Sequence, residues 1–141
     1  MDLHFYKYQG TGNDFVLVDN RNKYFKNDTK FIQKICDRRF GVGADGFILL
    51  ENSAMDLCDF KMIYFNADGN ESTMCGNGGR CIVAFAKHLK VIETETTFEA
   101  VDGLHSAIIN GNSVTLKMVD VPTVNISKNA CFMDTGSPHY L

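Results

Sequence analysis

The chain has 141 residues, which is enough for one domain or for one domain with the beginning of a second. Its 14 basic and 17 acidic residues give a net charge of -3, so there is no electrostatic footprint for nucleic acid or for an anionic membrane. The first residues lack the basic and then apolar order of a secretion signal, and no apolar run approaches the roughly 18 residues that span a bilayer. We therefore expect a globular protein of the cytoplasm.

The first forty residues predict two strands and a helix. An aromatic run from Leu3 to Tyr8 and an aliphatic run from Phe15 to Asp19 are typical of strands, with a glycine-rich turn between them. Asp28 or Thr29 can cap a helix that we expect to end near Arg38-Arg39. The apolar stripe of this helix consists of Phe31, Ile32 and Ile35.

Residues 41–46 have the GxGxxG spacing that dinucleotide-binding proteins use to hold a pyrophosphate. That fingerprint requires a strand before the glycines and a helix after them. Here the predicted helix comes first and a strand from Phe47 to Leu50 follows, so we predict a turn and not a nucleotide site. The next strand is expected at Phe60–Phe65, before the polar turn Asn66–Gly69.

A cysteine, Cys75, precedes the second predicted helix. We expect its thiol in the first turn of that helix, close to unpaired backbone N–H groups and to the positive end of the macrodipole, which favour thiolate over thiol. The glycines that follow would let an anion approach the same amides closely. We interpret Cys75 as a candidate catalytic base or nucleophile beside an anion site. Its helix carries almost no charge, which indicates burial inside a curled sheet, with one apolar face formed by Ile82, Phe85, Ala86 and Leu89.

The last third of the chain predicts strands. They are expected at residues 97–101, 104–109, 113–118 and 130–134, with a hairpin turn at Asn110–Asn112. Two helices among many strands, without a regular β-α-β alternation, indicate the α+β class. Residues 119–128 are predicted to be a linker.

The five cysteines form an odd, irregularly spaced set, which argues against a disulfide framework. No CxxC pair is present, so structural zinc is not expected. Cys75 differs from the other four by its glycine and asparagine neighbours. We interpret the others as small buried apolar residues: Cys36, Cys58, Cys81 and Cys131.

Three asparagines, Asn13, Asn66 and Asn77, each lie in a glycine-flanked turn. Asparagine is common in turns because its side chain bonds the local backbone, and it also offers neutral hydrogen bonds to a polar zwitterion. Spacing does not decide between these two interpretations. His139 could be a partner for Cys75, although a lone histidine is more often structural.

The chain contains four distinctive blocks of sequence: Gly10–Phe15, Arg38–Gly46, Phe65–Gly69 and Met74–Cys81. Together they resemble the diaminopimelate epimerase family, in which they occur in the same order and at comparable spacing. The resemblance covers essentially the whole chain. The family interconverts LL- and meso-diaminopimelate, on the route to lysine and peptidoglycan, without pyridoxal phosphate or metal. The resemblance implies one lobe of that fold, a curled mixed or antiparallel sheet wrapped around a central helix.

The resemblance also implies roles for individual residues. Cys75 is similar to the first of two cysteines that face the substrate α-carbon from opposite sides. One removes the α-proton as thiolate, and the other protonates the opposite face as thiol. The amides of Gly76 and Asn77 would bind the α-carboxylate at the helix N-terminus. Asn13 and Asn66 match positions that hold the distal end of the substrate.

The chain departs from the family in one residue and in length. Ser137 stands where the family typically has an asparagine before Pro-His, so that one distal contact would be shortened or would pass through water. Family members are about twice this length and are built as two lobes. Residues 1–120 would be the N-terminal lobe, and residues 121–141 would be a crossover linker and the first strand of the second lobe. Because the second cysteine belongs to that second lobe, we expect the isolated chain to be inactive or nearly so.

Two alternatives to a diaminopimelate epimerase remain from the sequence. One is a related racemase or isomerase that acts on another small acid. The other is a non-catalytic small-molecule-binding domain in which Cys75 is only a packed residue. The expected partner is in each case a small molecule. The resemblance is also consistent with a full-length protein that forms a homodimer.

Overall fold

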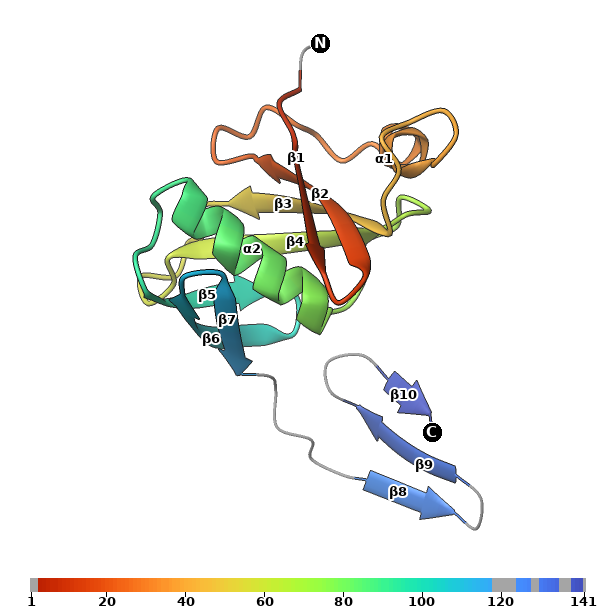
Figure 1. Cartoon of the computed structure of the whole chain (residues 1–141), viewed down its shortest axis with the longest axis vertical. Coiled ribbons are helices and arrows are strands. Elements are labelled where there is room, and N and C mark those ends of the chain that lie inside the picture. Colours follow the sequence, from red (N-terminus) through yellow and green to blue (C-terminus); the bar gives the residue numbers. More distant parts are fainter. Residues whose placement is uncertain (1–2, 118–123, 128–129, 135–137, 141) are drawn as a thin grey trace.

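The computed structural model describes residues 3–117 with their side chains, and residues 124–127, 130–134 and 138–140 as strands (Figure 1). Neither helix in this part of the chain is long and apolar enough to cross a membrane. The helices are α1 (Thr29–Cys36) and α2 (Gly76–His88). The strands are β1 (Tyr6–Gly10), β2 (Asn13–Asp19), β3 (Gly46–Glu51), β4 (Phe60–Asn66), β5 (Glu95–Ala100), β6 (Gly103–Asn110), β7 (Ser113–Lys117), β8 (Val124–Ser127), β9 (Ala130–Asp134) and β10 (Pro138–Tyr140).

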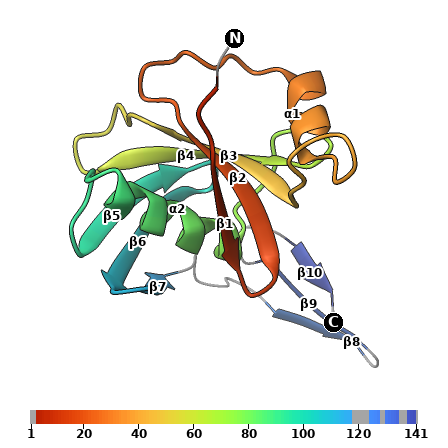
Figure 2. The same cartoon turned by 45° about the horizontal axis from the view of Figure 1, so that its top comes forward.

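The first seven strands form one mixed sheet in the order β1-β2-β3-β4-β5-β6-β7. The pairs β2·β3 and β4·β5 are parallel, and the other neighbours are antiparallel. The sheet curls around α2, which contacts both edge strands, β1 and β7 (Figure 2). The predicted α+β fold, with a curled mixed sheet around a central helix, is confirmed. The last three strands form a small antiparallel sheet in the order β10-β9-β8.

The central strands are buried on both faces, and alternate residues belong to two hydrophobic cores. In β2, Phe15 and Leu17 belong to the core around α2, while Val16 and Val18 belong to the core under α1. Strand β3 divides its side chains in the same way. This explains why both strands are continuous apolar runs in the sequence, because a strand covered on both faces has no solvent side to fill with polar residues.

Helix α1 begins as the sequence predicts and ends earlier than predicted. The Asp28 carboxylate accepts a hydrogen bond from the Phe31 N–H at 3.1 Å and caps the helix. The helix ends at Cys36 instead of near Arg38-Arg39, because Asp37 takes an extended conformation with φ -65° and ψ 127°. Amides of the following loop then bond back to the carbonyls of the last turn, including the Ala44 N–H to the Cys36 oxygen at 3.1 Å.

That loop contains the GxGxxG spacing and is a turn leading into β3, as expected. A side chain at Gly41 would place its Cβ 2.0 Å from the backbone oxygen of Lys34. A backbone atom cannot move aside cheaply, so glycine is needed here for packing against α1. The glycine spacing therefore has a structural cause that does not involve a nucleotide.

Two strands were not predicted from the sequence. Strand β8 (Val124–Ser127) lies within residues 119–128, which were expected to be a linker, and β10 (Pro138–Tyr140) follows Ser137. Both are four residues or fewer, and their pairing with β9 supplies the hydrogen bonds that define them. Such short strands carry too little alternation to be recognised locally.

Candidate functional site

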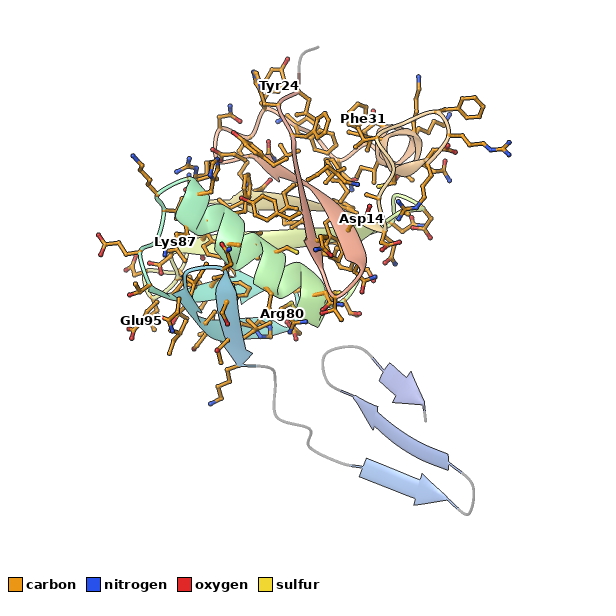
Figure 3. All side chains as sticks on the ribbon, in the orientation of Figure 1. Asp14, Tyr24, Phe31, Arg80, Lys87 and Glu95 are labelled. Carbon is orange, nitrogen blue, oxygen red and sulfur yellow. The ribbon has the colours of Figure 1, made fainter. Side chains whose placement is uncertain are left out.

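The predicted site residues that the structure describes converge on one end of the large sheet. Strand β2 begins at Asn13, while β4 ends at Asn66, which lies opposite Gly46 at the start of β3. Helix α2 also begins at this end of the sheet. The contact that places it there is a hydrogen bond of 2.6 Å, which the Asn77 side chain donates to the Asn13 side chain. Figure 3 shows Arg80 toward this end of α2 and Lys87 toward the other. Residues that are 64 positions apart in the sequence thus form one polar surface.

Cys75 is the N-cap residue of α2 and not a residue of its first turn. Its backbone is extended, with φ -114° and ψ 126°, and its carbonyl accepts from the Gly79 N–H at 2.8 Å. The side chain is half-buried and does not cap the helix by a hydrogen bond. The thiol therefore lies beside the N-terminus of α2 without accepting a hydrogen bond from the first helical N–H groups, so these groups can bind another acceptor.

The first amides of α2 belong to Gly76 and Asn77, which are both half-buried. The first N–H groups of an α-helix have no intrahelical acceptor, and the macrodipole places partial positive charge at the same position. A carboxylate is the kind of group that such an end binds. The geometry is therefore compatible with the anion site that the sequence predicts beside Cys75.

The next two glycines have a structural role that the sequence interpretation missed. Gly78 and Gly79 are buried, and a side chain at Gly79 would place its Cβ 2.4 Å from Cε of Met74 and 2.8 Å from Cδ2 of Leu116. These glycines let the start of α2 approach the sheet closely. Only the first part of the glycine-rich run remains available for a ligand.

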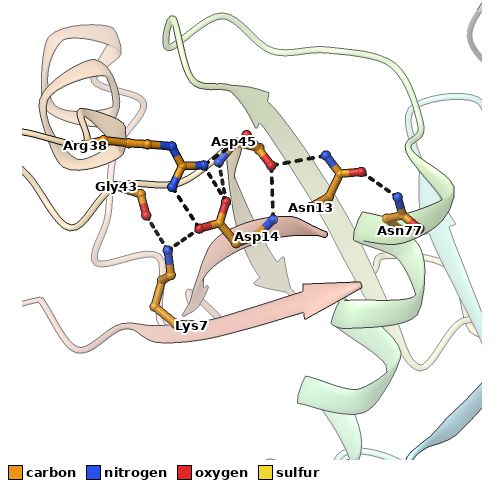
Figure 4. Close-up of polar contacts among 7 residues, drawn as sticks. All are labelled: Lys7, Asn13, Asp14, Arg38, Gly43, Asp45 and Asn77. Atoms are coloured by element: carbon orange, nitrogen blue, oxygen red, sulfur yellow. Dashed lines mark hydrogen bonds and ion pairs between the residues drawn. The ribbon is translucent and has the colours of Figure 1, made fainter. Parts of the chain in front are cut away.

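A chain of hydrogen bonds connects the start of α2 to the start of β3 (Figure 4). The Arg80 guanidinium donates to Oδ1 of Asn77. Asn77 in turn donates from Nδ2 to Oδ1 of Asn13 at 2.6 Å, and Asn13 donates from Nδ2 to Oδ2 of Asp45 at 3.1 Å. Two of the three asparagines that were singled out in the sequence, Asn13 and Asn77, are thus held between a guanidinium and a carboxylate.

Asp45 belongs to a cluster of two acids and two bases. The Arg38 guanidinium donates two hydrogen bonds to Asp14, at 2.8 and 3.2 Å, and one to Asp45 at 3.1 Å. The Lys7 ammonium lies 2.8 Å from Asp14 and also donates to the Gly43 carbonyl. These bonds, those from Arg38 first, hold the pKa of the Asp14 carboxyl well below its usual range. The cluster is formally neutral and joins β1, β2 and the loop before β3.

Two neighbours of Cys75 have pKa values that burial raises. Burial raises the pKa of the Cys81 thiol to about 11, with a smaller contribution from the charge of Cys75. Burial also raises the pKa of Tyr64 to about 12, again with a contribution from Cys75. Cys81 is buried and remains a thiol at neutral pH, so it is unsuited to act as a base.

The remaining predicted residues differ in position and in burial. Asn66 is exposed, with its backbone in the turn that closes β4, where its N–H donates to the Asn70 carbonyl at 2.9 Å. Ser137 lies outside the described residues. His139 belongs to β10. Cys36 and Cys81 are buried as expected, whereas Cys58 is only half-buried.

The sequence interpretation gave no role to Asp14, Arg38, Asp45 or Arg80. A local signal existed, since all four lie within the glycine-containing blocks. Charged residues in such turns are usually solvated, however, and nothing local shows that Asp14 meets Arg38 and Asp45 across 24 and 31 positions of sequence. Among the residues that the structure describes, no three His, Cys, Asp or Glu side chains are grouped to hold a metal ion.

The low pKa of Asp14 predicts how acid affects stability. A carboxyl whose pKa is lowered by folding stabilises the protein above its unfolded pKa of about 3.9, and this contribution is lost as pH falls below that value. Asp14 is 23% exposed and its partner Arg38 is 59% exposed, so we expect Asp14→Asn to cost about 1 kcal/mol at pH 6. Urea unfolding at pH 6 and pH 3 measures this, and the difference between variant and wild type should shrink at pH 3. Asp56→Asn, an exposed loop carboxylate, is the control.

Comparison with known sequences identifies the relatives of this chain. The family model described as diaminopimelate epimerase matches residues 5–124. A diaminopimelate epimerase of Flavobacterium psychrophilum is 60% identical over 141 residues, covering 99% of this chain and 54% of the relative. Diaminopimelate epimerases of Chlorobaculum tepidum and Aquifex aeolicus are 44% and 34% identical, covering 92% and 99% of this chain and 53% and 56% of the relatives. The chain thus spans about half the length of the curated relatives it matches.

Solved structures with low sequence identity share the fold. A hydroxyproline epimerase of Agrobacterium vitis aligns with a TM-score of 0.65 at 15% identity, covering 92% of this chain and 47% of that chain. A methylitaconate-delta-isomerase aligns with a TM-score of 0.61 at 11% identity, covering 94% and 71%. At such identities the likeness concerns the fold alone, and it agrees with the curled sheet around α2.

Proposed function

The chain belongs to the diaminopimelate epimerase family, and we propose that the full-length protein interconverts LL- and meso-diaminopimelate. The observation that carries the proposal is the meeting of four predicted elements at one end of the sheet. These are the Cys75 thiol, the first amides of α2, and the side chains of Asn77 and Asn13. A base, an anion site and neutral hydrogen-bonding groups are what an amino-acid epimerase must offer its substrate.

The proposed reaction is a proton transfer at the α-carbon with two thiols. The Cys75 thiolate removes the α-proton, and the electron pair of the C–H bond moves into the α-carbon and its carboxylate. The other cysteine, supplied by the remainder of the protein, delivers its thiol proton to the opposite face. Cys75 ends as a thiol and the other cysteine as a thiolate, so the reverse reaction starts from the complementary state.

The amides of Gly76 and Asn77 are proposed to bind the α-carboxylate. Negative charge on that carboxylate grows while the proton is being removed, and preorganised N–H groups stabilise such charge most in the transition state. The half-buried position of both residues supports this assignment, since partial exclusion of water strengthens the interaction. Asn13 and Asn66, at the same end of the sheet, are assigned to the distal end of the substrate. A contact of Ser137 with that distal end remains a prediction from the sequence.

Residues 1–120 are proposed to form the N-terminal lobe, with residues 121–141 leading into a second lobe. The seven-stranded sheet ends at Lys117 and the family match ends at residue 124, which supports a division in this region. The curated relatives are about twice as long as the chain, which supports a second lobe. The isolated chain would then lack the second acid, and general acid–base groups contribute about 10²- to 10⁴-fold each.

Incubation of the full-length protein with pure LL-diaminopimelate in deuterated water tests the proposal. We expect meso-diaminopimelate to form with one deuterium at the inverted carbon, as followed by chiral chromatography and NMR. The isolated 141-residue chain should invert at least about 10²-fold more slowly. Inversion of a different amino acid but not of diaminopimelate would instead identify a related racemase. A protein that binds diaminopimelate without any exchange would be a non-catalytic binding domain.

A further inference from the structure

The hydrogen-bonded chain from Arg80 to Asp45 allows only one orientation of each asparagine. A guanidinium has donors and no acceptor, whereas a carboxylate has acceptors and no donor. With Arg80 donating at one end, Asn77 must present its oxygen to Arg80 and its NH₂ to Asn13. Asn13 must then present its NH₂ to Asp45. Each NH₂ uses one of its two N–H bonds in the chain and keeps the second for another acceptor.

Reversing either amide would be costly. If Asn13 were flipped, its oxygen would face the Asp45 carboxylate and its NH₂ would face the NH₂ of Asn77. Two acceptors and two donors would then oppose each other among half-buried groups, where an unmade hydrogen bond is expensive. The orientation of the two asparagines is therefore set from both ends of the chain, by Arg80 as a donor only and by residue 45 as an acceptor only.

Asp45 is itself fixed by a neighbouring strand and by Arg38. Its Oδ2 accepts from the Asp14 N–H at 3.2 Å, and its Oδ1 accepts from Arg38 at 3.1 Å. Its own N–H donates back to Asp14, to the carbonyl at 2.9 Å and to Oδ1 at 3.1 Å. The carboxylate is 40% exposed, so burial alone does not hold it in place. These directed bonds do so instead.

We propose that Asp45 is a positioning residue that, together with Arg80 at the other end of the chain, sets the amide orientation of Asn13 and, through Asn13, that of Asn77. The second N–H of each amide is thereby directed to an acceptor on the substrate, without a net charge beside the Cys75 thiolate. Arg38 contributes by holding the Asp45 carboxylate. The inference rests on the proposed function, because it names the groups that keep the substrate-binding amides in one orientation.

The test is a double-mutant cycle in the full-length protein with diaminopimelate as substrate. Asp45→Asn keeps the size of the side chain but lets residue 45 donate or accept, so the acceptor-only end of the asparagine chain is lost and Arg80 alone holds its orientation. We expect KM to rise about 10- to 100-fold, as for loss of a hydrogen bond to a charged group, with a smaller change in kcat. Asn13→Ala should raise KM by a similar factor.

The cycle distinguishes a positioning role from a purely structural one. If Asp45 acts through Asn13, adding Asp45→Asn to Asn13→Ala should change KM by no more than about twofold. Independent effects that multiply in the double variant would overturn the proposal, as would an unchanged KM for Asp45→Asn. If Asp45→Asn does not fold, Arg38→Gln tests the same support from a more exposed side chain, with an expected rise in KM and the same cycle.

Asp19→Asn is the matched control. Asp19 lies on β2 and, like Asp45, forms an ion pair with an arginine, Arg21 at 2.7 Å, but it is at the end of β2 opposite to Asn13. KM should be unchanged in this variant, and an equal rise there would refute a specific role for Asp45. A wild-type protein that does not invert diaminopimelate would refute the proposed function, and with it this role. An active wild type with an unaffected Asp45→Asn variant would refute the positioning role alone.

Discussion

Replacing Cys75 by alanine in the full-length protein is expected to abolish inversion of diaminopimelate, with a loss of at least about 10²- to 10⁴-fold in kcat. The reason is that one of the two proton-transferring groups is removed while the helix and its amides remain. Cys75 has no capping hydrogen bond to lose, so the fold should tolerate the change. Chiral chromatography of the two stereoisomers measures the rate in both directions.

Solvent exchange makes this prediction sharper. With Cys75 absent, the second cysteine can still remove and return the α-proton of the stereoisomer that it faces. Deuterium should therefore enter one stereoisomer without inversion, and should not enter the other. Exchange into both stereoisomers at the wild-type rate would show that Cys75 is not one of the two bases.

Cys58→Ala is the matched control for Cys75→Ala. Cys58 is the other half-buried free cysteine among the described residues, and it lies in the loop before β4, away from the start of α2. Its replacement should leave both inversion and exchange unchanged. A comparable loss in both variants would point to a general effect of thiol removal.

Replacing Phe85 by alanine is expected to lower the free energy of unfolding by about 3–5 kcal/mol, the usual cost of emptying a buried phenylalanine site. Phe85 is 0% exposed and lies in the C-terminal half of α2. Its ring packs against Tyr6 and Tyr8 of β1, with centroids 5.0 and 5.8 Å away. The cavity would loosen the helix from an edge of the sheet that has a single neighbouring strand.

Phe40→Ala is the matched control for stability. It removes the same atoms, but Phe40 is 81% exposed in the loop after α1. Urea unfolding of the 141-residue chain should give a change within about 0.5 kcal/mol of wild type for Phe40→Ala. Equal effects of the two substitutions would contradict the placement of α2 inside the curled sheet.

The sequence was most informative where the signal is local. The cap at Asp28, the apolar stripe of α1 and the uncharged course of α2 were all readable, because a helix repeats its environment every three or four residues. The end of α1 was misjudged because loop amides satisfy its last carbonyls, and this depends on the path of the loop. Strands β8 and β10 were missed because pairing with β9 defines them.

The sequence by itself determined the family and the fold class, and it marked Cys75 as the candidate catalytic residue. Its motifs are contiguous, and a cysteine followed by glycine and asparagine at a helix start has a local physical meaning. Only the tertiary structure decided that Asn13 and Asn77 form one unit between Asp45 and Arg80, and that Gly78 and Gly79 serve packing. Curling of the sheet around α2 brings together groups that are 31 to 64 residues apart, and no local pattern encodes such a meeting.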